Sequence, residues 1–327
     1  MTGIDPETTY IYLLEGANDR TAETWKKFIE DKKLQGLNLE TSINDGAKGI
    51  IIGVTSAFPG ILIQLDVFHA LMGIGKRIII IERQAYSKIA KEADLEKRVE
   101  VKGVHQKTKE ELKKIRAEVE ELVENYDTLN ILFGWLRELL GFTGYRVEDT
   151  KALIEFVLCE IEKNANKNEE LQKKVEGFRN NTEFLFTFMT RLQNEMEKHS
   201  KEKGIPLNAY EMMYEQLIYD EKSEEYQEIE CKLVMMLKED YERGREDFKK
   251  LLNSIKKASS IVENLNSRIR TYMNVKRMVP ENFFTLMKVY FNTMRYRRSR
   301  IKERVGKSPL EILTGRKQPS FMEAIGF

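Results

Sequence analysis

The sequence predicts a helix-rich protein of the α/β plus α class, in which a small partial sheet is interrupted by a large all-helical insertion. Apolar residues make up 41% of the 327 residues and recur at regular intervals, which indicates a packed core rather than disorder. The charged content of 33% and the six prolines favour helices with solvent-exposed faces. Runs of β-forming residues gather near the N-terminus, before a long stretch with helical periodicity. Together these observations predict three parts: residues 1–105, 106–252 and 253–327.

The first part, residues 1–105, alternates strand and helix patterns. Strands are predicted at three runs rich in β-forming residues: Thr9–Leu14, Leu37–Ile43 and Ile61–Leu65. Helices are predicted at Ala22–Lys33, at Ala47–Phe58 and from Val67 to about Asp94. Thr21 is a suitable N-cap for the first of these helices, and the pair Pro59-Gly60 ends the second.

The second part, residues 106–252, has the periodicity of packed helices. Apolar side chains recur at alternating spacings of three and four residues from Leu112 to Leu129. Because this pattern lasts for only about three heptads, it favours packing within a bundle over a free coiled coil. The clearest break in the helical pattern is Gly204-Ile-Pro206.

The third part, residues 253–327, contains two capping boxes, in which a Ser is followed three residues later by a Glu. The first, Ser260-Ile-Val-Glu263, predicts a helix that runs to about Arg277, and another helix is predicted to begin at Pro280. The second capping box, Ser308-Pro-Leu-Glu311, has Pro at the first helical position and predicts a short helix that ends at Gly315.

The net charge of +1 hides an asymmetry along the chain. Residues 255–317 hold 16 Lys and Arg against 4 Asp and Glu, which leaves the rest of the chain at −11. The densest run, Arg295–Arg304, contains six basic residues and one acid. This density favours contact with nucleic-acid phosphates. The alternative is a solvated, charged helix end.

The sequence lacks the motifs of several common classes of protein. The Gly73–Arg77 run lacks the upstream glycine and the Ser or Thr of a phosphate loop, and the three histidines are too scattered to suggest a hydrolase triad. Cys159 and Cys231 form neither a disulfide framework nor a zinc spacing, which is typical of a reducing cytosol. The apolar runs are far shorter than the ~20 residues that span a bilayer. We therefore expect a cytoplasmic protein without a membrane partner.

Two acidic residues are candidates for metal chemistry. Asp45 directly follows a predicted strand and begins a turn flanked by Gly46 and Gly49; carboxylates at strand ends often converge on divalent metals. Glu263 lies one turn into a predicted helix, with Arg270 two turns further on the same face, where it could touch a phosphate backbone. The alternatives are that Asp45 is an ordinary turn or N-cap residue and that Glu263 is only a capping-box residue.

Taken together, these residues resemble the DDE transposases of bacterial and archaeal insertion sequences, which have a ribonuclease-H-like catalytic domain. In that family a helix precedes the second catalytic Asp, a strand ends at this Asp, a further strand leaves through a Q-x-x-x-x-H motif, and a later helix carries the catalytic Glu before a common C-terminal tail. The matching stretches are Arg20–Trp25, Ile43–Gly49, Gln64–His69, Ser259–Arg270 and Arg304–Gly315.

The resemblance implies a function and a site. Three acids would hold two Mg²⁺ ions, or Mn²⁺, for attack on a DNA phosphodiester during cleavage and strand transfer at transposon ends, with Asp45 and Glu263 as two of these acids. Asp66 and His69 would lie at the active-site floor, although helix capping and a buried hydrogen bond are the plainer roles. The partner would be DNA, and the active complex at least a homodimer. The basic residues expected to contact DNA are Arg268, Arg270, Lys276, Arg277, Arg295, Arg297, Arg298, Arg300 and Arg304.

One part of the family pattern is missing. A ribonuclease-H-like fold opens with a strand that carries the first catalytic Asp, whereas here a single strand is predicted before the helix that contains Trp25. Asp5 and Asp19 have the sequence context of turn and helix-approach residues. We therefore expect an N-terminally shortened transposase that binds DNA but cleaves it poorly or not at all. The competing hypotheses are an inactive, DNA-binding relative and, from another class, a helical scaffold protein whose acids are incidental.

Overall fold

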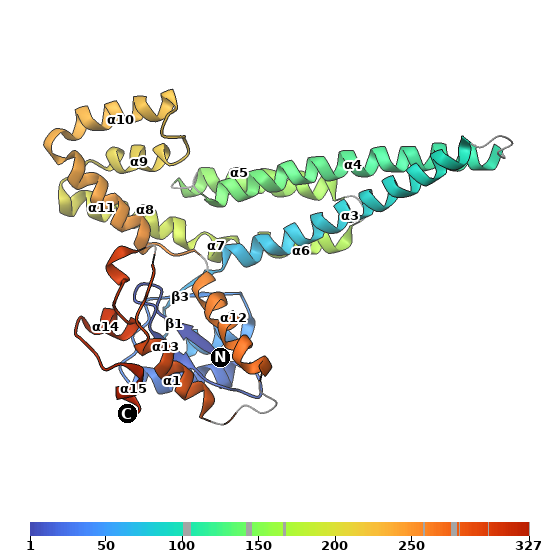
Figure 1. Ribbon diagram of the computed structural model, residues 1–327. Coiled ribbons are helices and arrows are strands. Elements are labelled where there is room, and N and C mark those ends of the chain that lie inside the picture. Colours follow the sequence, from blue (N-terminus) through green and yellow to red (C-terminus); the bar gives the residue numbers. More distant parts are fainter. Residues whose placement is uncertain are drawn as a thin grey trace. The chain divides into compact units, whose positions relative to one another are not determined.

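The computed structural model describes residues 1–100, 106–141, 146–165, 168–257, 259–275, 280, 282–299 and 301–326. Contacts between residues divide the chain into two compact units. The sheet unit comprises Met1–Asp66 and Lys256–Phe327, and the helical unit comprises Val67–Ile255. The protein is therefore a mixed α/β chain with a large helical portion, and the predicted fold class is confirmed (Figure 1).

The sheet unit contains two small sheets and the helices that cover them. In the first sheet, β1 (Thr2–Ile4) pairs antiparallel with β2 (Ile11–Leu14). In the second, β3 (Thr41–Asn44) pairs in parallel with β4 (Leu62–Leu65), so that Asn44 lies opposite Leu65. The helices are α1 (Ala22–Leu34), α2 (Lys48–Ala57), α12 (Ser260–Val275), α13 (Phe283–Thr293), α14 (Pro309–Thr314) and α15 (Phe321–Ala324), with a 3₁₀ turn at Lys302–Arg304.

Segments from both ends of the chain build the core of the sheet unit. Ile11 and Leu14 of β2 pack against buried apolar residues of α12 and α13. The side chain of Asn292 accepts a hydrogen bond from the backbone N–H of Ile11 at 2.8 Å and donates one to its carbonyl at 2.9 Å. Asn292 thus satisfies the edge of β2 as a neighbouring strand would. A core assembled in this way holds the basic C-terminal segment against the N-terminal hairpin.

Two details of the sheets differ from the sequence predictions. Strand β1 was not predicted, because a three-residue run that contains a glycine carries too weak a pattern, so two strands rather than one precede α1. Asp5 lies between these strands, where its carboxylate accepts the backbone N–H groups of Glu7 and Thr8, which confirms its interpretation as a turn residue. Strand β3 begins at Thr41, four residues later than predicted.

The helical unit contains helices joined by turns, and its described residues include no strand. Its helices are α3 (Val67–Val99), α4 (Gln106–Gly141), α5 (Val147–Asn164), α6 (Glu169–Arg179), α7 (Thr182–Leu185), α8 (Thr187–Lys203), α9 (Leu207–Gln216), α10 (Glu224–Leu237) and α11 (Tyr241–Ser254). Helices α3 and α4 run side by side as a long pair, with Leu95 packed near Leu112 and Ile115 (Figure 1). A second core, around the buried Tyr210, joins α8, α9, α10 and α11.

The boundary between the units lies earlier than the sequence indicated. The sequence placed residues 67–105 with the sheet and began the insertion at residue 106, but α3 packs along α4 and so belongs to the helical unit. The return to the sheet unit falls at Lys256 instead of residue 253. Among the described residues, no helix is both long enough and apolar enough to cross a membrane.

Candidate nucleic-acid interface and metal site

Two aspartates follow the parallel strands at the same edge of the sheet. The backbone N–H of Asp66 donates to the carbonyl of Asn44 at 2.7 Å, which extends the β3–β4 ladder by one step. Asp45 and Asp66 therefore follow neighbouring strands, whose backbones lie about 5 Å apart in a regular sheet. Asp45 is exposed, and its Oδ1 accepts the N–H of Ala47 at 3.2 Å. The turn that it begins places Gly46 at φ +83°, a conformation that glycine adopts without strain.

Asp66 joins this sheet edge to the helix that carries Glu263. The Asp66 side chain is buried, and its Oδ2 accepts hydrogen bonds from the backbone N–H of Ser259, at 2.8 Å, and from the Ser259 hydroxyl. The carbonyl of Ser259 in turn accepts the N–H groups of Val262 and Glu263, so α12 begins here. A carboxylate beside the first N–H groups of a helix also interacts favourably with the helix dipole. A contact across 193 residues of sequence therefore joins the start of α12 to the end of β4.

The two predicted metal ligands are both accessible. Asp45 and Glu263 are exposed, and carboxylate oxygens suit Mg²⁺ or Mn²⁺. Within the described residues, no three His, Cys, Asp or Glu side chains gather as a metal site. The close approach of the Asp45 and Glu263 carboxylates stays a prediction. The other residue expected near the active-site floor, His69, lies in the first turn of α3, in the helical unit, where its ring contacts that of Phe68.

Two of the predicted DNA-contacting arginines are engaged within the fold. Arg295 forms an ion pair with Glu311, in which Nη2 of Arg295 lies 2.8 Å from Oε1 of Glu311 and Nε donates to Oε2. Arg304 donates to the backbone carbonyls of Pro6 and Glu7. Arg268, Arg270, Arg297 and Arg298 are exposed. Lys276, Arg277 and Arg300 lie outside the described residues.

The buried side chain of Glu311 accepts hydrogen bonds from several donors. Its side chain caps α14 by accepting the N–H of Ser308 at 2.9 Å, and it also accepts the N–H of Gln318. The bonds from Arg295 and from these N–H groups outweigh the effect of burial and lower the pKa of Glu311 to about 2. The predicted capping box is thus confirmed, and the basic run that follows α13 is anchored to α14.

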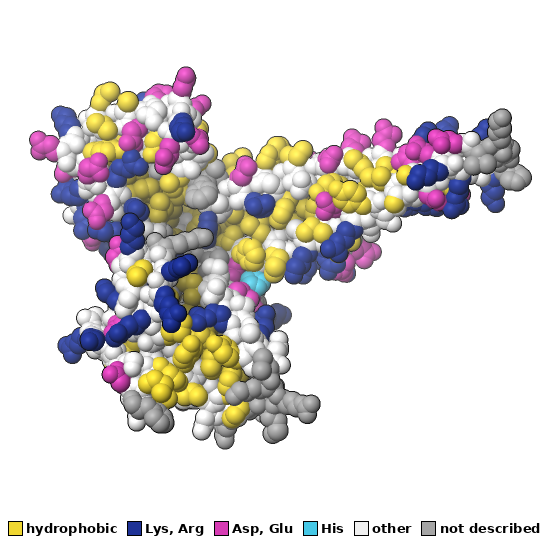
Figure 2. All heavy atoms as spheres, viewed as in Figure 1, with side chains coloured by type: hydrophobic (Ala, Val, Ile, Leu, Met, Phe, Trp, Pro, Cys, Tyr) yellow, Lys and Arg dark blue, Asp and Glu magenta, His cyan; other side chains and the backbone are white. Residues whose placement is uncertain are grey.

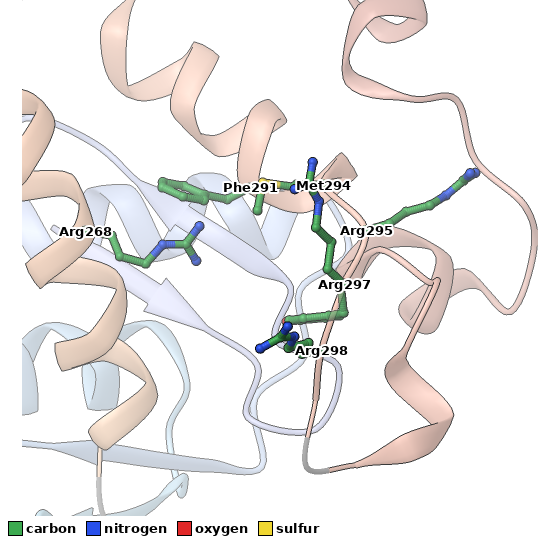
Figure 3. A pocket seen from close by; sticks show the side chains of 7 residues that line it. Arg268, Phe291, Met294, Arg295, Arg297 and Arg298 are labelled. Atoms are coloured by element: carbon green, nitrogen blue, oxygen red, sulfur yellow. The ribbon is translucent and has the colours of Figure 1, made fainter.

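Three of the exposed arginines, Arg268, Arg297 and Arg298, border a pocket in the sheet unit. It is lined by Arg268, Phe291, Met294, Arg295, Tyr296, Arg297 and Arg298 (Figure 3). The guanidinium carbon of Arg268 lies 4.3 Å from the centroid of the Phe291 ring. Figure 2 shows Lys and Arg side chains beside an apolar patch on one face of this unit. Phe291 and Met294 were not predicted as site residues; the signal in the sequence is their position next to the basic run.

Comparisons with protein-family models, with curated proteins and with solved structures give no match. The functional assignment therefore depends on the residues and contacts described above.

Proposed function

We propose that this protein is a DNA-binding protein of the DDE transposase type, whose sheet unit contacts DNA phosphates and presents Asp45 and Glu263 as metal ligands. Its reaction would be phosphodiester cleavage and strand transfer at transposon ends. The observation that carries this proposal is the bond from Ser259 to Asp66, because it begins the Glu263 helix at the strand edge that bears Asp45. This arrangement joins sequence motifs separated by 218 positions.

The donor groups suit a hard divalent cation. Asp45 and Glu263 offer exposed carboxylate oxygens, and Mg²⁺ is commonly held by one or two carboxylates together with substrate phosphates. When bound, such a cation polarises a phosphoryl oxygen and lowers the pKa of a bound water. Because DNA phosphates would complete the ligand set, we expect the cation to bind more tightly in the presence of DNA than in its absence.

Phosphate binding is the part of the proposal that most residues support. Arg268, Arg270, Arg297 and Arg298 are exposed on one unit, so their guanidinium groups can reach a phosphate backbone. The likeness to transposases further implies at least a homodimer in the active complex. Size-exclusion chromatography with light scattering, with and without DNA, would test that state.

Metal-dependent cleavage is the direct test of the catalytic proposal. We expect the purified chain to bind a labelled duplex that carries the terminal inverted repeats, and to nick it slowly with Mg²⁺ or Mn²⁺. Asp45→Asn and Glu263→Gln should each abolish the nicking while leaving binding in place, whereas Asp31→Asn, an exposed change on α1, should alter neither. Nicking that survives both active-site changes would contradict the assignment.

The proximity of the two carboxylates can be measured separately. In a background with Cys159→Ser and Cys231→Ser, the pair Asp45→Cys and Glu263→Cys should be joined by a short bifunctional thiol reagent, because a two-metal site requires metals about 4 Å apart. The cross-link is read by mass spectrometry. If only longer reagents, beyond about three times that spacing, join the two thiols, Asp45 and Glu263 cannot share a metal site.

A DNA-binding protein that does not cleave is the second candidate. The engagement of Asp66 with Ser259 favours it, because it commits the Asp66 carboxylate, which follows β4 next to Asp45, to holding α12. Salt-dependent DNA binding without any metal-dependent nicking would select this candidate. A chain that binds no DNA would instead match the helical-scaffold hypothesis.

A further inference from the structure

Arg268 and Phe291 form a stacked pair in which one member is buried and the other exposed. Phe291, in α13, is 5% exposed and belongs to the core of the sheet unit, whereas Arg268, on α12, is exposed. The guanidinium carbon lies 4.3 Å from the ring centroid, within the range of cation–π contacts. The ring therefore supports one face of a planar, positively charged group at the edge of the pocket, and this support restrains a side chain that is otherwise flexible.

The rest of the pocket supplies apolar surface and positive charge. Met294 is 42% exposed, and the exposed Arg297 and Arg298 follow it in the segment after α13. In Figure 3 the Arg295 side chain points away from Arg268, and its charge is engaged by Glu311. The pocket has a volume of about 560 Å³, which lies within the roughly 300–1,000 Å³ typical of small-molecule sites. Its size and lining suit a planar group that carries a phosphate.

We propose that this pocket binds an unpaired nucleotide of a DNA strand, with the base stacked on the Arg268 guanidinium beside Met294 and the phosphate contacted by Arg297 and Arg298. This inference rests on the proposed DNA-binding function and specifies the form of DNA that the site prefers. Inside a duplex both faces of a paired base are covered by its neighbours, so an internal base can offer a face to Arg268 only when it is unpaired. Arginine planes and aromatic rings are the side chains on which unpaired bases stack.

The preference is measured with two matched duplexes. One is fully paired, and the other carries a single bulged 2-aminopurine nucleotide in the same sequence. Anisotropy titration of the full chain should show at least about fivefold tighter binding to the bulged duplex, as expected from one base stack. The 2-aminopurine fluorescence should change on binding, because stacking alters its emission.

Three substitutions separate stacking from charge. Arg268→Lys keeps the charge but removes the planar group, so it should lose the preference for the bulged duplex over the paired one. Arg270→Lys, two residues further on the same helix, is the matched comparison: any change in phosphate contact should affect both duplexes alike, so the preference for the bulge should stay. Met294→Ala changes an exposed side chain and should reduce the preference while leaving the circular dichroism spectrum unchanged.

The outcomes distinguish this inference from the function on which it rests. Equal binding of both duplexes by the parent chain, with unchanged 2-aminopurine emission, would overturn the pocket proposal and leave phosphate-driven DNA binding intact. Absence of binding to either duplex would overturn both. Millimolar deoxyadenosine monophosphate should reduce the preference for the bulge, because a free nucleotide offers the same base face and phosphate to the pocket; a preference that survives this competition unchanged would contradict the pocket proposal.

Discussion

Neighbouring arginines in the basic run have different roles. Arg295 is held by Glu311, and Arg304 by backbone carbonyls of the N-terminal segment, so both stabilise the return of the chain to the sheet unit. Arg297 and Arg298 are exposed and border the pocket. A sequence pattern that counts six basic residues in ten cannot separate these roles, because the partner of Arg295 lies 16 residues away.

We predict that the double variant Arg297→Ala/Arg298→Ala weakens DNA binding and lowers the salt slope of log Kd by about 2, since each lost phosphate contact removes about 1. Its urea unfolding curve should match that of the parent. Arg295→Ala should behave in the opposite way. Its urea unfolding midpoint should fall, because the ion pair with Glu311 is lost. Its salt slope of log Kd should stay close to that of the parent, because the Arg295 charge is paired with Glu311 and not with a phosphate. Fluorescence anisotropy at several salt concentrations and urea titrations give both quantities. Equal effects of the two variants on DNA binding would contradict this division.

The carboxyl group of Glu311 makes the free energy of unfolding depend on pH at acidic pH. Its pKa is about 2 in the folded chain, below its ordinary value of 4.5, chiefly because Arg295 hydrogen-bonds to the charged form. A depressed carboxyl pKa contributes stability that is fully present above about 4.5 and is lost as the pH falls toward 2.

We therefore predict that Glu311→Gln lowers the stability of the sheet unit at pH 6 and has less effect at pH 3. Trp25 reports on this unit once Trp135→Phe has removed the other tryptophan, so its emission during urea titration gives the measurement. Glu303→Gln changes an exposed acid in the same segment and serves as the control. A loss of stability at pH 3 as large as that at pH 6 would show that Glu311 acts through packing rather than through its charge.

The start of α12 depends on a residue from another segment of the chain. The Ser260-Ile-Val-Glu263 pattern predicts Ser260 as the N-cap, whereas Ser260 is the first residue of α12 and the hydrogen bonds to Asp66 are made by the preceding residue, Ser259. These bonds tie the helix to the end of β4 and are therefore a tertiary contact as well as a cap.

We predict that Asp66→Asn destabilises the sheet unit by about 1–3 kcal/mol, because it removes a buried charged acceptor that two donors share. Ser259→Ala should cost less, since the backbone N–H still donates to Asp66. Asp31→Asn, on an exposed face of α1, is the control. Trp25 emission in the Trp135→Phe background gives the free energy of unfolding. An Asp66→Asn chain as stable as the control would show that the contact does not hold the helix.

Local sequence patterns predicted which elements carry the candidate site residues, but not the contact that joins these elements. Asp45 follows a strand of β-forming residues, and Glu263 follows a serine by three positions, so both could be assigned to element ends from a few neighbouring residues. The hydrogen bond between Asp66 and Ser259 joins residues 193 positions apart, and no repeating pattern in the sequence predicts it. The same reason applies to Phe291, whose sequence context indicates core, while its contact with Arg268 depends on how α12 and α13 pack.

The charge of the protein divides between its two units. The sheet unit holds 22 Lys and Arg against 15 Asp and Glu, whereas the helical unit holds 32 against 38. A near-neutral chain thus combines one unit that attracts a polyanion with one that weakly repels it. Many charges of the helical unit also lie in ion pairs along its helices, such as Lys88 with Glu118 and Arg179 with Glu162.

We predict that DNA binding by the full chain is strongly salt-dependent and is confined to the sheet unit. With the four exposed arginines Arg268, Arg270, Arg297 and Arg298 as phosphate contacts, the slope of log Kd against log salt should be about 3 to 4, since each contact releases roughly 0.9 of a counterion. Photo-cross-linking to a paired duplex, followed by mass spectrometry, should label peptides from α12 and from the segment after α13. Lys88→Ala, which breaks an ion pair between α3 and α4, should leave both the slope and the labelled peptides unchanged. Cross-links mainly on α3 and α4, or a slope near zero, would mean that phosphate contacts in the sheet unit do not drive binding.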